Sequence, residues 1–307
     1  MQTIPRPEYP RPQLVCKDWM NLNGTWQFTI DSGVDGFDCE YYKREDFAQE
    51  ITVPFCPESA LSGVGHKGFM PCVWYRRTVQ LPDAWDGKQI LLHFGAVDYH
   101  ATVWVNGQLA GEHRGGYSSF CFDITKHLHK GENSIVVAAK DDARSGAQPA
   151  GKQSELYHSH HCSYTRTTGI WQTVWLEAVH PKHITTVKAT PDAAASSVLL
   201  EVKTAKDTIG CTVEAQVYFE GKMVGNGTAT VGSFSALLPI KLSETHLWDV
   251  GQGNLYDVVL CLKDKDAVTD EVESYFGLRS VGLKDGAFFL NGRAVFGRWC
   301  RQGLCGL

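Results

Sequence analysis

The sequence predicts an all-β protein made of two domains. Its 307 residues are about twice the length of one typical domain. From Leu22 to about Val179, short runs rich in Val, Ile, Trp, Phe and Tyr are interrupted by Gly, Pro, Asn or Asp at the spacing of antiparallel strands and turns. No stretch shows the periodicity of a long amphipathic helix.

The first domain, residues 1–180, is predicted to be an antiparallel β domain. Its clearest chain reversal is Asn106-Gly107, which follows Val103-Trp104-Val105 and fits a two-residue type I′ turn. Trp171 and Trp175 are four residues apart and are expected to fill the core from one face of a strand. Strands are predicted at residues 26–30, 74–81, 134–139 and 171–177, and in the segment 90–111.

Residues 141–163 differ from the sequence around them and are expected to form a long exposed loop. The segment contains Ala, Gly, Pro, Gln and a histidine cluster, with almost no apolar periodicity. His158, His160 and Cys162 alternate, so an extended chain would place three potential Zn²⁺ ligands on one face. No fourth ligand can be identified, so the prediction is a polar loop without a metal, and a zinc site remains the alternative.

The second domain, residues 181–276, is predicted to be a seven-strand sandwich of about 100 residues. Strands are expected at residues 198–204, 212–220, 236–240 and 256–263. A third pattern begins at residue 277, where the segment 287–296 predicts a hairpin around the Asn291-Gly292 turn.

Composition excludes several classes of function. Lys plus Arg (29) do not exceed Asp plus Glu (34) and the net charge is −5, which argues against nucleic acid as a partner. No apolar run is long enough to span a membrane, and the N-terminus has Pro and Arg where a signal peptide needs an apolar run. The ten cysteines are scattered without a CxxC pair. We therefore expect a cytoplasmic protein with free thiols and no cofactor.

Several longer motifs resemble glycoside hydrolase family 2, the β-galactosidase and β-glucuronidase group. The resemblance implies an N-terminal jelly-roll, galactose-binding-like sandwich, then an immunoglobulin-like sandwich, and in complete members a catalytic (β/α)8 barrel. Residues 277–307 are similar to the start of that barrel. The motifs are Leu22-Asn23-Gly24-Thr25-Trp26, Val53-Pro54, Trp74-Tyr75-Arg76-Arg77, Phe94-Gly95-Ala96-Val97-Asp98, Val103-Trp104-Val105-Asn106-Gly107, His113-Arg114-Gly115-Gly116-Tyr117, residues 168–177 and Phe276-Gly277-Leu278-Arg279.

The chain departs from the family where catalysis would begin. Members hydrolyse glycosides with two Glu carboxylates on the barrel, one directly after an Asn, whereas residues 278–307 contain no Glu and Asn-Glu occurs nowhere. The barrel also needs about 250 residues. We expect the isolated chain to be an inactive N-terminal portion of a glycosidase, with residues 297–307 resembling a frameshifted or truncated end. The alternatives are a stand-alone carbohydrate-binding module, or a subunit that docks on a separate barrel or self-associates through its exposed barrel-facing surface.

The resemblance also suggests residues that contact a β-glycoside. Asp98 sits where the family places a polar side chain that reaches the sugar, although it could simply end a strand. Arg166 could hold an acidic sugar or pair with Asp98, and the alternative is a surface ion pair. Tyr117 follows two glycines and is a candidate for an exposed sugar-stacking ring.

Overall fold

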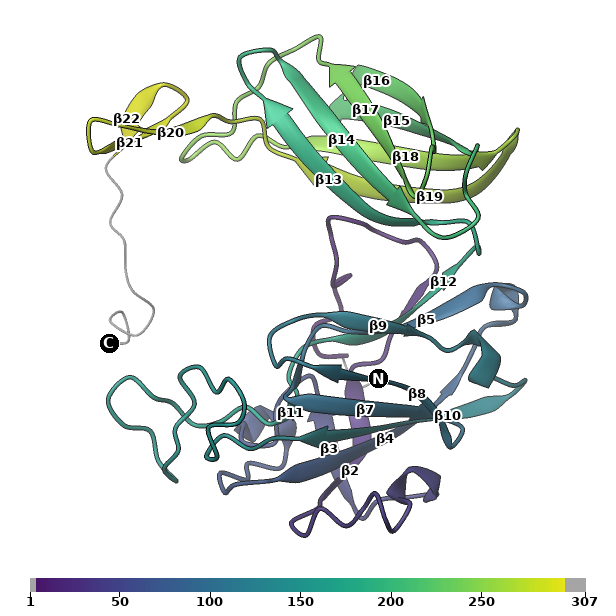
Figure 1. Ribbon diagram of the computed structural model, residues 1–307, viewed down its shortest axis with the longest axis vertical. Coiled ribbons are helices and arrows are strands. Elements are labelled where there is room, and N and C mark those ends of the chain that lie inside the picture. The colour runs from purple at the N-terminus through teal and green to yellow at the C-terminus, as the bar shows by residue number, and fades with distance from the viewer. Residues whose placement is uncertain (1–3, 296–307) are drawn as a thin grey trace. The chain divides into compact units, whose positions relative to one another are not determined.

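The computed structural model describes residues 4–295, which form two β units (Figure 1). The first unit comprises the chain up to Pro10 together with Asp18–Ala178, and the second comprises Arg11–Lys17 and the chain from Val179 onward. The helical elements of the described residues are short 3-10 turns, so the predicted all-β class is confirmed. These turns are η1 (Tyr41–Lys43), η2 (Ala60–Ser62), η3 (Asp83–Trp85) and η4 (Thr125–His127).

The first unit is a jelly-roll sandwich of two main sheets and one small strand pair. The four-stranded sheet has the order β1 (Trp19–Asn21), β12 (Val174–Val179), β5 (Gln89–Phe94), β9 (Phe120–Asp123). The six-stranded sheet has the order β3 (Gln49–Val53), β2 (Gly24–Ile30), β4 (Cys72–Gln80), β10 (Glu132–Lys140), β7 (His100–Val105), β8 (Gln108–Arg114). The pair is β6 (Val97–Asp98) and β11 (Gly169–Ile170).

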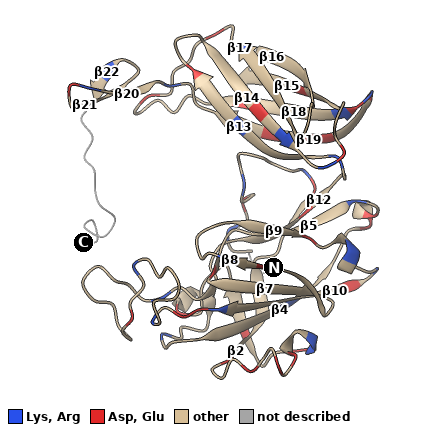
Figure 2. Ribbon diagram, in the orientation of Figure 1, with Lys and Arg blue, Asp and Glu red and all other residues tan. Residues whose placement is uncertain are grey.

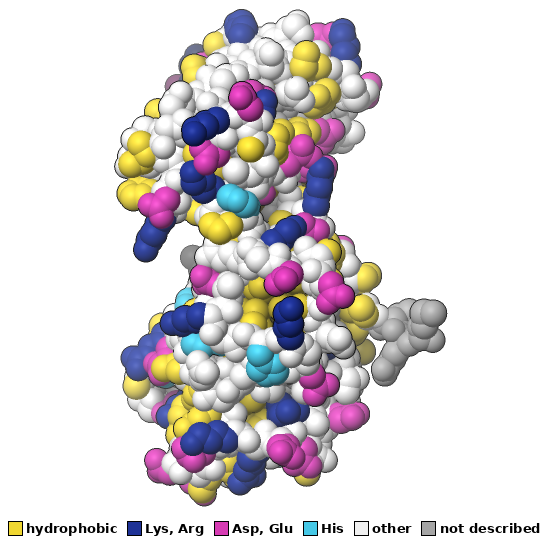
Figure 3. Space-filling model, turned by 90° about the vertical axis from the view of Figure 1, so that its right-hand side faces the viewer, with side chains coloured by type: hydrophobic (Ala, Val, Ile, Leu, Met, Phe, Trp, Pro, Cys, Tyr) yellow, Lys and Arg dark blue, Asp and Glu magenta, His cyan; other side chains and the backbone are white. Residues whose placement is uncertain are grey.

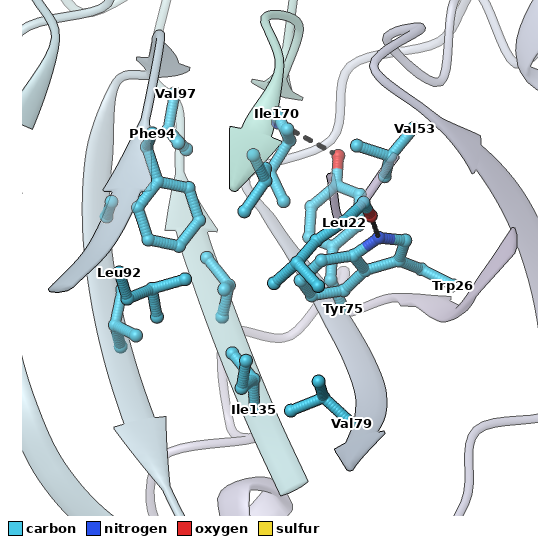
Figure 4. Close-up of a cluster of buried hydrophobic side chains, with 14 of the residues drawn as sticks. Leu22, Trp26, Val53, Tyr75, Val79, Leu92, Phe94, Val97, Ile135 and Ile170 are labelled. Carbon is cyan, nitrogen blue, oxygen red and sulfur yellow. Dashed lines mark hydrogen bonds between the residues drawn. The ribbon is translucent and has the colours of Figure 1, made fainter. Parts of the chain in front are cut away.

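Alternating inward side chains of the two sheets form the core of the first unit (Figure 4). The two polar aromatic groups in the close-up are satisfied inside it. Trp26 Nε1 donates to the Leu22 carbonyl at 2.7 Å, and the Tyr75 hydroxyl accepts from the Ile170 amide at 3.2 Å. Burial therefore leaves neither polar atom without a hydrogen-bond partner.

The predicted turn at Asn106-Gly107 joins β7 to β8. Both residues have positive φ, 50° and 73°, and Val105 pairs with Gln108 across the turn, as a type I′ hairpin requires. The side-chain Nδ2 of Asn106 also donates to the His127 carbonyl at 2.8 Å, which fixes the hairpin tip against η4.

The second unit has the seven-strand, two-sheet architecture of an immunoglobulin-like sandwich. One sheet has the order β13 (Ile184–Asp192), β14 (Ser197–Thr204), β17 (Ser235–Lys241), and the other has the order β16 (Lys222–Thr230), β15 (Thr212–Phe219), β18 (Tyr256–Asp264), β19 (Ala267–Phe276). The aliphatic side chains of both sheets alternate inward to form its core.

A small sheet follows the second sandwich. It consists of β20 (Val281–Lys284), β21 (Ala287–Leu290) and β22 (Arg293–Val295), and Asn291-Gly292 forms the predicted turn with φ of 50° and 75°. Strand β20 was not predicted from the sequence. Phe296 and the segment 297–307, for which we expected an irregular end, lie outside the described residues.

Residues 11–17 add an extended segment to the edge of the second unit. The Val15 amide donates to the Glu273 carbonyl of β19 at 2.8 Å, and the Glu273 amide donates back at 3.3 Å. Leu14 is buried in the core of the second unit, and Lys17 forms an ion pair with Glu271. The predicted domain boundaries at residues 180 and 276 stay predictions, but the fold shows that part of the N-terminus packs with the second unit.

Charged side chains of both signs are interspersed over each unit (Figure 2). The face shown in Figure 3 likewise mixes Lys, Arg, Asp and Glu with small hydrophobic groups. Within residues 4–295, none of the helical elements has the length and apolar character needed to cross a membrane.

Replacing Leu14 with alanine is expected to destabilise the second unit, even though Leu14 lies between two segments of the first unit in the sequence. Leu14 is 4% exposed, and truncating such a core leucine costs about 2–5 kcal/mol. The matched control is Leu237→Ala on β17, whose side chain is 57% exposed; a surface change should cost about 0.5 kcal/mol or less. Calorimetric unfolding measures both, and equal effects would contradict the packing of residues 11–17.

Candidate functional site

Asp98 is the central residue of the candidate site and is almost completely buried. It ends β6, pairs with Gly169 of β11, and is 1% exposed. Its Oδ2 accepts from Gln153 Nε2 at 2.8 Å, whereas Oδ1 is buried and has no hydrogen-bond partner in the described chain. Burial, reinforced by the charge of Asp141, raises the pKa of Asp98 to about 7.

A glycine turn covers this carboxylate. A Cβ on Gly116 would lie 2.4 Å from Asp98 Cγ, so the close approach requires glycine at this position. Trp171 Nε1 donates to the Gly116 carbonyl at 2.7 Å and holds the turn in place. Asp98 Oδ1 is therefore not open to a ligand in this conformation.

Tyr117 lies on the outer side of the same turn. Its side chain is 67% exposed, and its ring packs edge-to-face on Trp171 with centroids 5.3 Å apart. Burial, and then the charges of Asp98 and Asp141, raise the pKa of the Tyr117 phenol. Of the three predicted substrate-binding residues, the structure thus brings Asp98 and Tyr117 together.

Trp171 and Trp175 do not share a strand, contrary to the sequence-based expectation. Trp171 lies between β11 and β12, is half-buried, and contacts the glycine turn rather than the core. Trp175 lies on β12 and is buried, but it is outside the core between the sheets; its Nε1 donates to Glu177 at 2.8 Å. The prediction assumed one continuous strand, whereas the strand is interrupted after Ile170.

Two further buried carboxylates lie near Asp98, and sequence reasoning missed both. The Thr168 amide donates to both oxygens of Glu58 at 3.2 Å, and the Thr168 hydroxyl donates to Asp141 Oδ2 at 2.9 Å. Burial raises the pKa of Glu58 and of Asp141. Asp141 directly follows β10 at the start of the long loop, and a carboxylate at the end of a strand could have been predicted as a site residue. No feature of the sequence around Glu58 singles it out.

Arg166 is a framework residue in this structure, neither a surface ion pair nor a partner of Asp98. It is 3% exposed and donates to the carbonyls of Ser154 at 3.0 Å, Leu156 at 2.5 Å, and Lys67. Its guanidinium also lies over the Phe69 ring, 4.0 Å from the centroid. Its predicted contact with an acidic sugar stays a prediction, and its present contacts are all within the protein.

The geometry gives no support to the alternative zinc site. His160 contacts Ser154 Oγ through Nδ1 at 3.0 Å and Glu155 Oε1 through Nε2 at 3.3 Å. The rings of His158 and His160 are 6.5 Å apart, and Cys162 is exposed. In the part of the chain that the structure describes, no group of three His, Cys, Asp or Glu side chains is arranged to hold a metal ion.

The segment 141–163 is only partly the exposed loop that the sequence predicted. Tyr157 is 68% exposed, but Gln153 and Ser154 are buried because they bond to Asp98 and to the backbone around His158. The site therefore combines exposed aromatic rings with a buried carboxylate acceptor, a combination suited to a ligand rich in hydroxyl groups.

Two family models match the chain, one on each unit. The model described as "Glycosyl hydrolases family 2, sugar binding domain" matches residues 60–176, and the model "Glycosyl hydrolases family 2" matches residues 182–279. Together they cover more than half of the sequence.

Curated relatives and solved structures agree with these matches. The chain is similar to a beta-galactosidase of Thermoanaerobacter pseudethanolicus, at 29% identity over 72% of this chain and 30% of the relative, and to the beta-glucuronidase of Felis catus, at 24% identity over 94% and 48%. The crystal structure of Ruminococcus gnavus beta-glucuronidase superposes with a TM-score of 0.76 at 22% identity, over 94% of this chain and 49% of that one. The chain thus spans from under a third to about half the length of these proteins.

Gly116→Ala is expected to destabilise the first unit, because the added methyl group would overlap the Asp98 carboxylate. Overpacking of this kind costs about 1–3 kcal/mol. The control is Gly33→Ala, where a Cβ would make ordinary contact with Asp35 at 3.6 Å and no positive φ is required. Thermal unfolding of the two variants measures the difference, and a Gly116→Ala protein as stable as Gly33→Ala would mean that the turn does not press on Asp98.

Proposed function

Because the chain belongs to glycoside hydrolase family 2 as the N-terminal portion of such an enzyme, we propose that its first unit contributes to binding a β-glycoside. The observation that carries this proposal is the grouping of Asp98, Tyr117 and Trp171 at one end of the jelly roll. Tyr117 supplies an exposed ring for the apolar face of a sugar, and Asp98 supplies an acceptor for its hydroxyl groups.

The isolated chain is proposed to bind without hydrolysing. Retaining hydrolysis needs two carboxyl groups about 5–5.5 Å apart on either side of the anomeric carbon. The described carboxylates at the site, Asp98, Glu58 and Asp141, are buried and bonded to the protein's own Gln153 and Thr168. They hold the fold of the site and do not face an open cleft as a catalytic pair.

Solved relatives support a carbohydrate ligand without fixing its identity. One structure of the Ruminococcus gnavus beta-glucuronidase is in complex with D-glucuronic acid and another with D-glucaro 1,5-lactone. The named relatives of this chain include both beta-galactosidases and beta-glucuronidases. We therefore propose the class of β-glycosides, including neutral and acidic sugars, for the complete site.

The second candidate function is docking on a separate barrel chain or self-association. It rests on the small sheet after the second sandwich, where Val281 is 62% exposed and Leu283 is 83% exposed on the same face of β20. Apolar side chains left in water favour association with another surface. Co-purification with a barrel-containing chain would support this candidate over a stand-alone binding module.

The purified chain is expected to show no hydrolysis of nitrophenyl β-galactoside or nitrophenyl β-glucuronide above background. The physical reason is that no carboxylate pair flanks an open sugar site in the described residues. A mock preparation from the same host measures contaminating glycosidase. Turnover that survives removal of host enzymes and is absent from the mock preparation would overturn the proposed inactivity.

Sugar binding is expected to depend on the Tyr117 ring. Tyr117→Ala should weaken binding of methyl β-galactoside or methyl β-glucuronide about fivefold, equivalent to about 1 kcal/mol for a lost aromatic contact. Tyr117→Phe keeps the ring and should bind like the original protein. Saturation-transfer NMR measures these affinities; equal binding by all three proteins, or no binding by any, would contradict the proposed site.

A further inference from the structure

We propose that Asp98, Asp141 and Glu58 form a proton-controlled clamp on the segment 153–168. When a carboxyl of the cluster is protonated, Gln153 and Thr168 hold this segment against the end of the jelly roll. When the cluster becomes fully ionised, the segment lifts and Asp98 becomes accessible to solvent. The clamp requires no ligand, so the experiment that tests it is independent of the experiment that tests sugar binding.

The geometry ties one segment to all three carboxylates through two residues. At its start, Gln153 Nε2 donates to Asp98 Oδ2 at 2.8 Å, and Gln153 Oε1 accepts from the Thr167 amide at 2.9 Å. At its end, Thr168 donates its hydroxyl to Asp141 and its amide to Glu58. The two ends of the segment are therefore fixed at the same buried cluster.

The three carboxylates come from separate parts of the fold, so the segment bridges elements that are distant in sequence. Asp98 ends β6, Asp141 directly follows β10, and Glu58 precedes η2. All three are buried, with exposed fractions of 1%, 7% and 5%. Lifting the segment removes donors from the cluster and admits water to it.

Charge in the cluster is unbalanced when all three groups are ionised. The positive charge of Arg166 favours ionisation of the cluster and lowers the pKa of Asp141. The negative charges of Asp141 and Glu58 both raise the pKa of Asp98. The other titratable neighbours are Tyr117 near Asp98, Cys56 and Tyr75 near Glu58, and Asp142 beside Asp141. Burial raises the pKa of Cys56 to about 12, so this thiol stays neutral, and Asp142 adds a further negative charge.

The direction of the pH effect follows from the raised pKa values. A carboxyl whose pKa is higher in the closed form than in the open form binds its proton more tightly when closed. Closing is therefore favoured at low pH and loses this advantage as the pH rises through the closed-state pKa of Asp98, about 7. The advantage is lost between the ordinary acidic range of a carboxyl pKa and a pH of about 7, above which both forms are ionised.

Hydrogen exchange of the full chain tests the clamp without a ligand. The amides of Thr167 and Thr168 donate to Gln153 and Glu58, so their protection reports directly on closing. Protection factors, corrected for intrinsic exchange at each pH, are expected to fall at least tenfold for peptides covering 164–170 between pH 5.5 and pH 8.5. Peptides from β10 and β15 should keep their protection and exclude global unfolding.

Two neutral variants decide whether Asp98 controls the effect. Asp98→Asn keeps an acceptor for Gln153 but cannot ionise, so protection of residues 164–170 should be nearly independent of pH. Asp123→Asn is the matched control: Asp123 is exposed, accepts from Gln89 and Thr125, and is not part of the cluster, so this variant should behave like the original protein. Unchanged protection in the original protein, or the same pH dependence in Asp98→Asn as in Asp123→Asn, would overturn the proposal.

Discussion

Burial of the Asp98 carboxylate is the constraint on which the candidate site depends. Removing an ionisable carboxyl from water costs free energy unless hydrogen bonds or a proton compensate. Gln153 satisfies one oxygen, and Gly116 closes over the group so tightly that no side chain fits between them. The exposed ring of Tyr117 and the indole of Trp171 are placed by the turn that performs this closure. The positions of the Tyr117 and Trp171 rings are thus a consequence of the way the Asp98 carboxylate is covered.

Both units of the fold also have sheet edges that must be covered. An open edge presents unpaired amides and carbonyls to any other extended chain. In the second unit, residues 11–17 pair with β19 through Val15 and Glu273, and Leu14 enters the core beside them. The sequence between Arg11 and Lys17 therefore serves a unit whose remaining strands begin more than 160 residues later. Neither composition nor local periodicity encodes such a pairing, because its partner lies at the far end of the chain.

The sequence was most informative where one local rule decides the structure. Short runs of β-branched and aromatic residues interrupted by turn residues predicted the β sandwiches. Asn-Gly predicted the turns at residues 106–107 and 291–292, because positive φ favours these residues. The motifs brought attention to Asp98 and Tyr117, which the structure places together. The surface ion-pair alternative for Arg166 and the strand position of Trp171 were wrong because tertiary contacts set both environments. Backbone carbonyls surround Arg166, and Trp171 bonds to the glycine turn. Glu58 was missed for the same reason.

The hydrogen bonds around Asp98 also determine which of its oxygens carries a proton. Gln153 Nε2 can only donate, and its Oε1 already accepts from the Thr167 amide, so Asp98 Oδ2 must remain an acceptor. A proton on the carboxyl therefore resides on Oδ1, the unpartnered oxygen. A sugar hydroxyl reaching Oδ1 would accept from the protonated group and donate to the ionised one, since a hydroxyl can do either. The same contact is thus available in both states, but the ionised state accepts a charge-assisted hydrogen bond and binds the hydroxyl more strongly. Loss of the proton strengthens this contact and the Gln153 hydrogen bond alike, so the proposed opening of the segment rests on the cost of burying the charge and not on weaker hydrogen bonds.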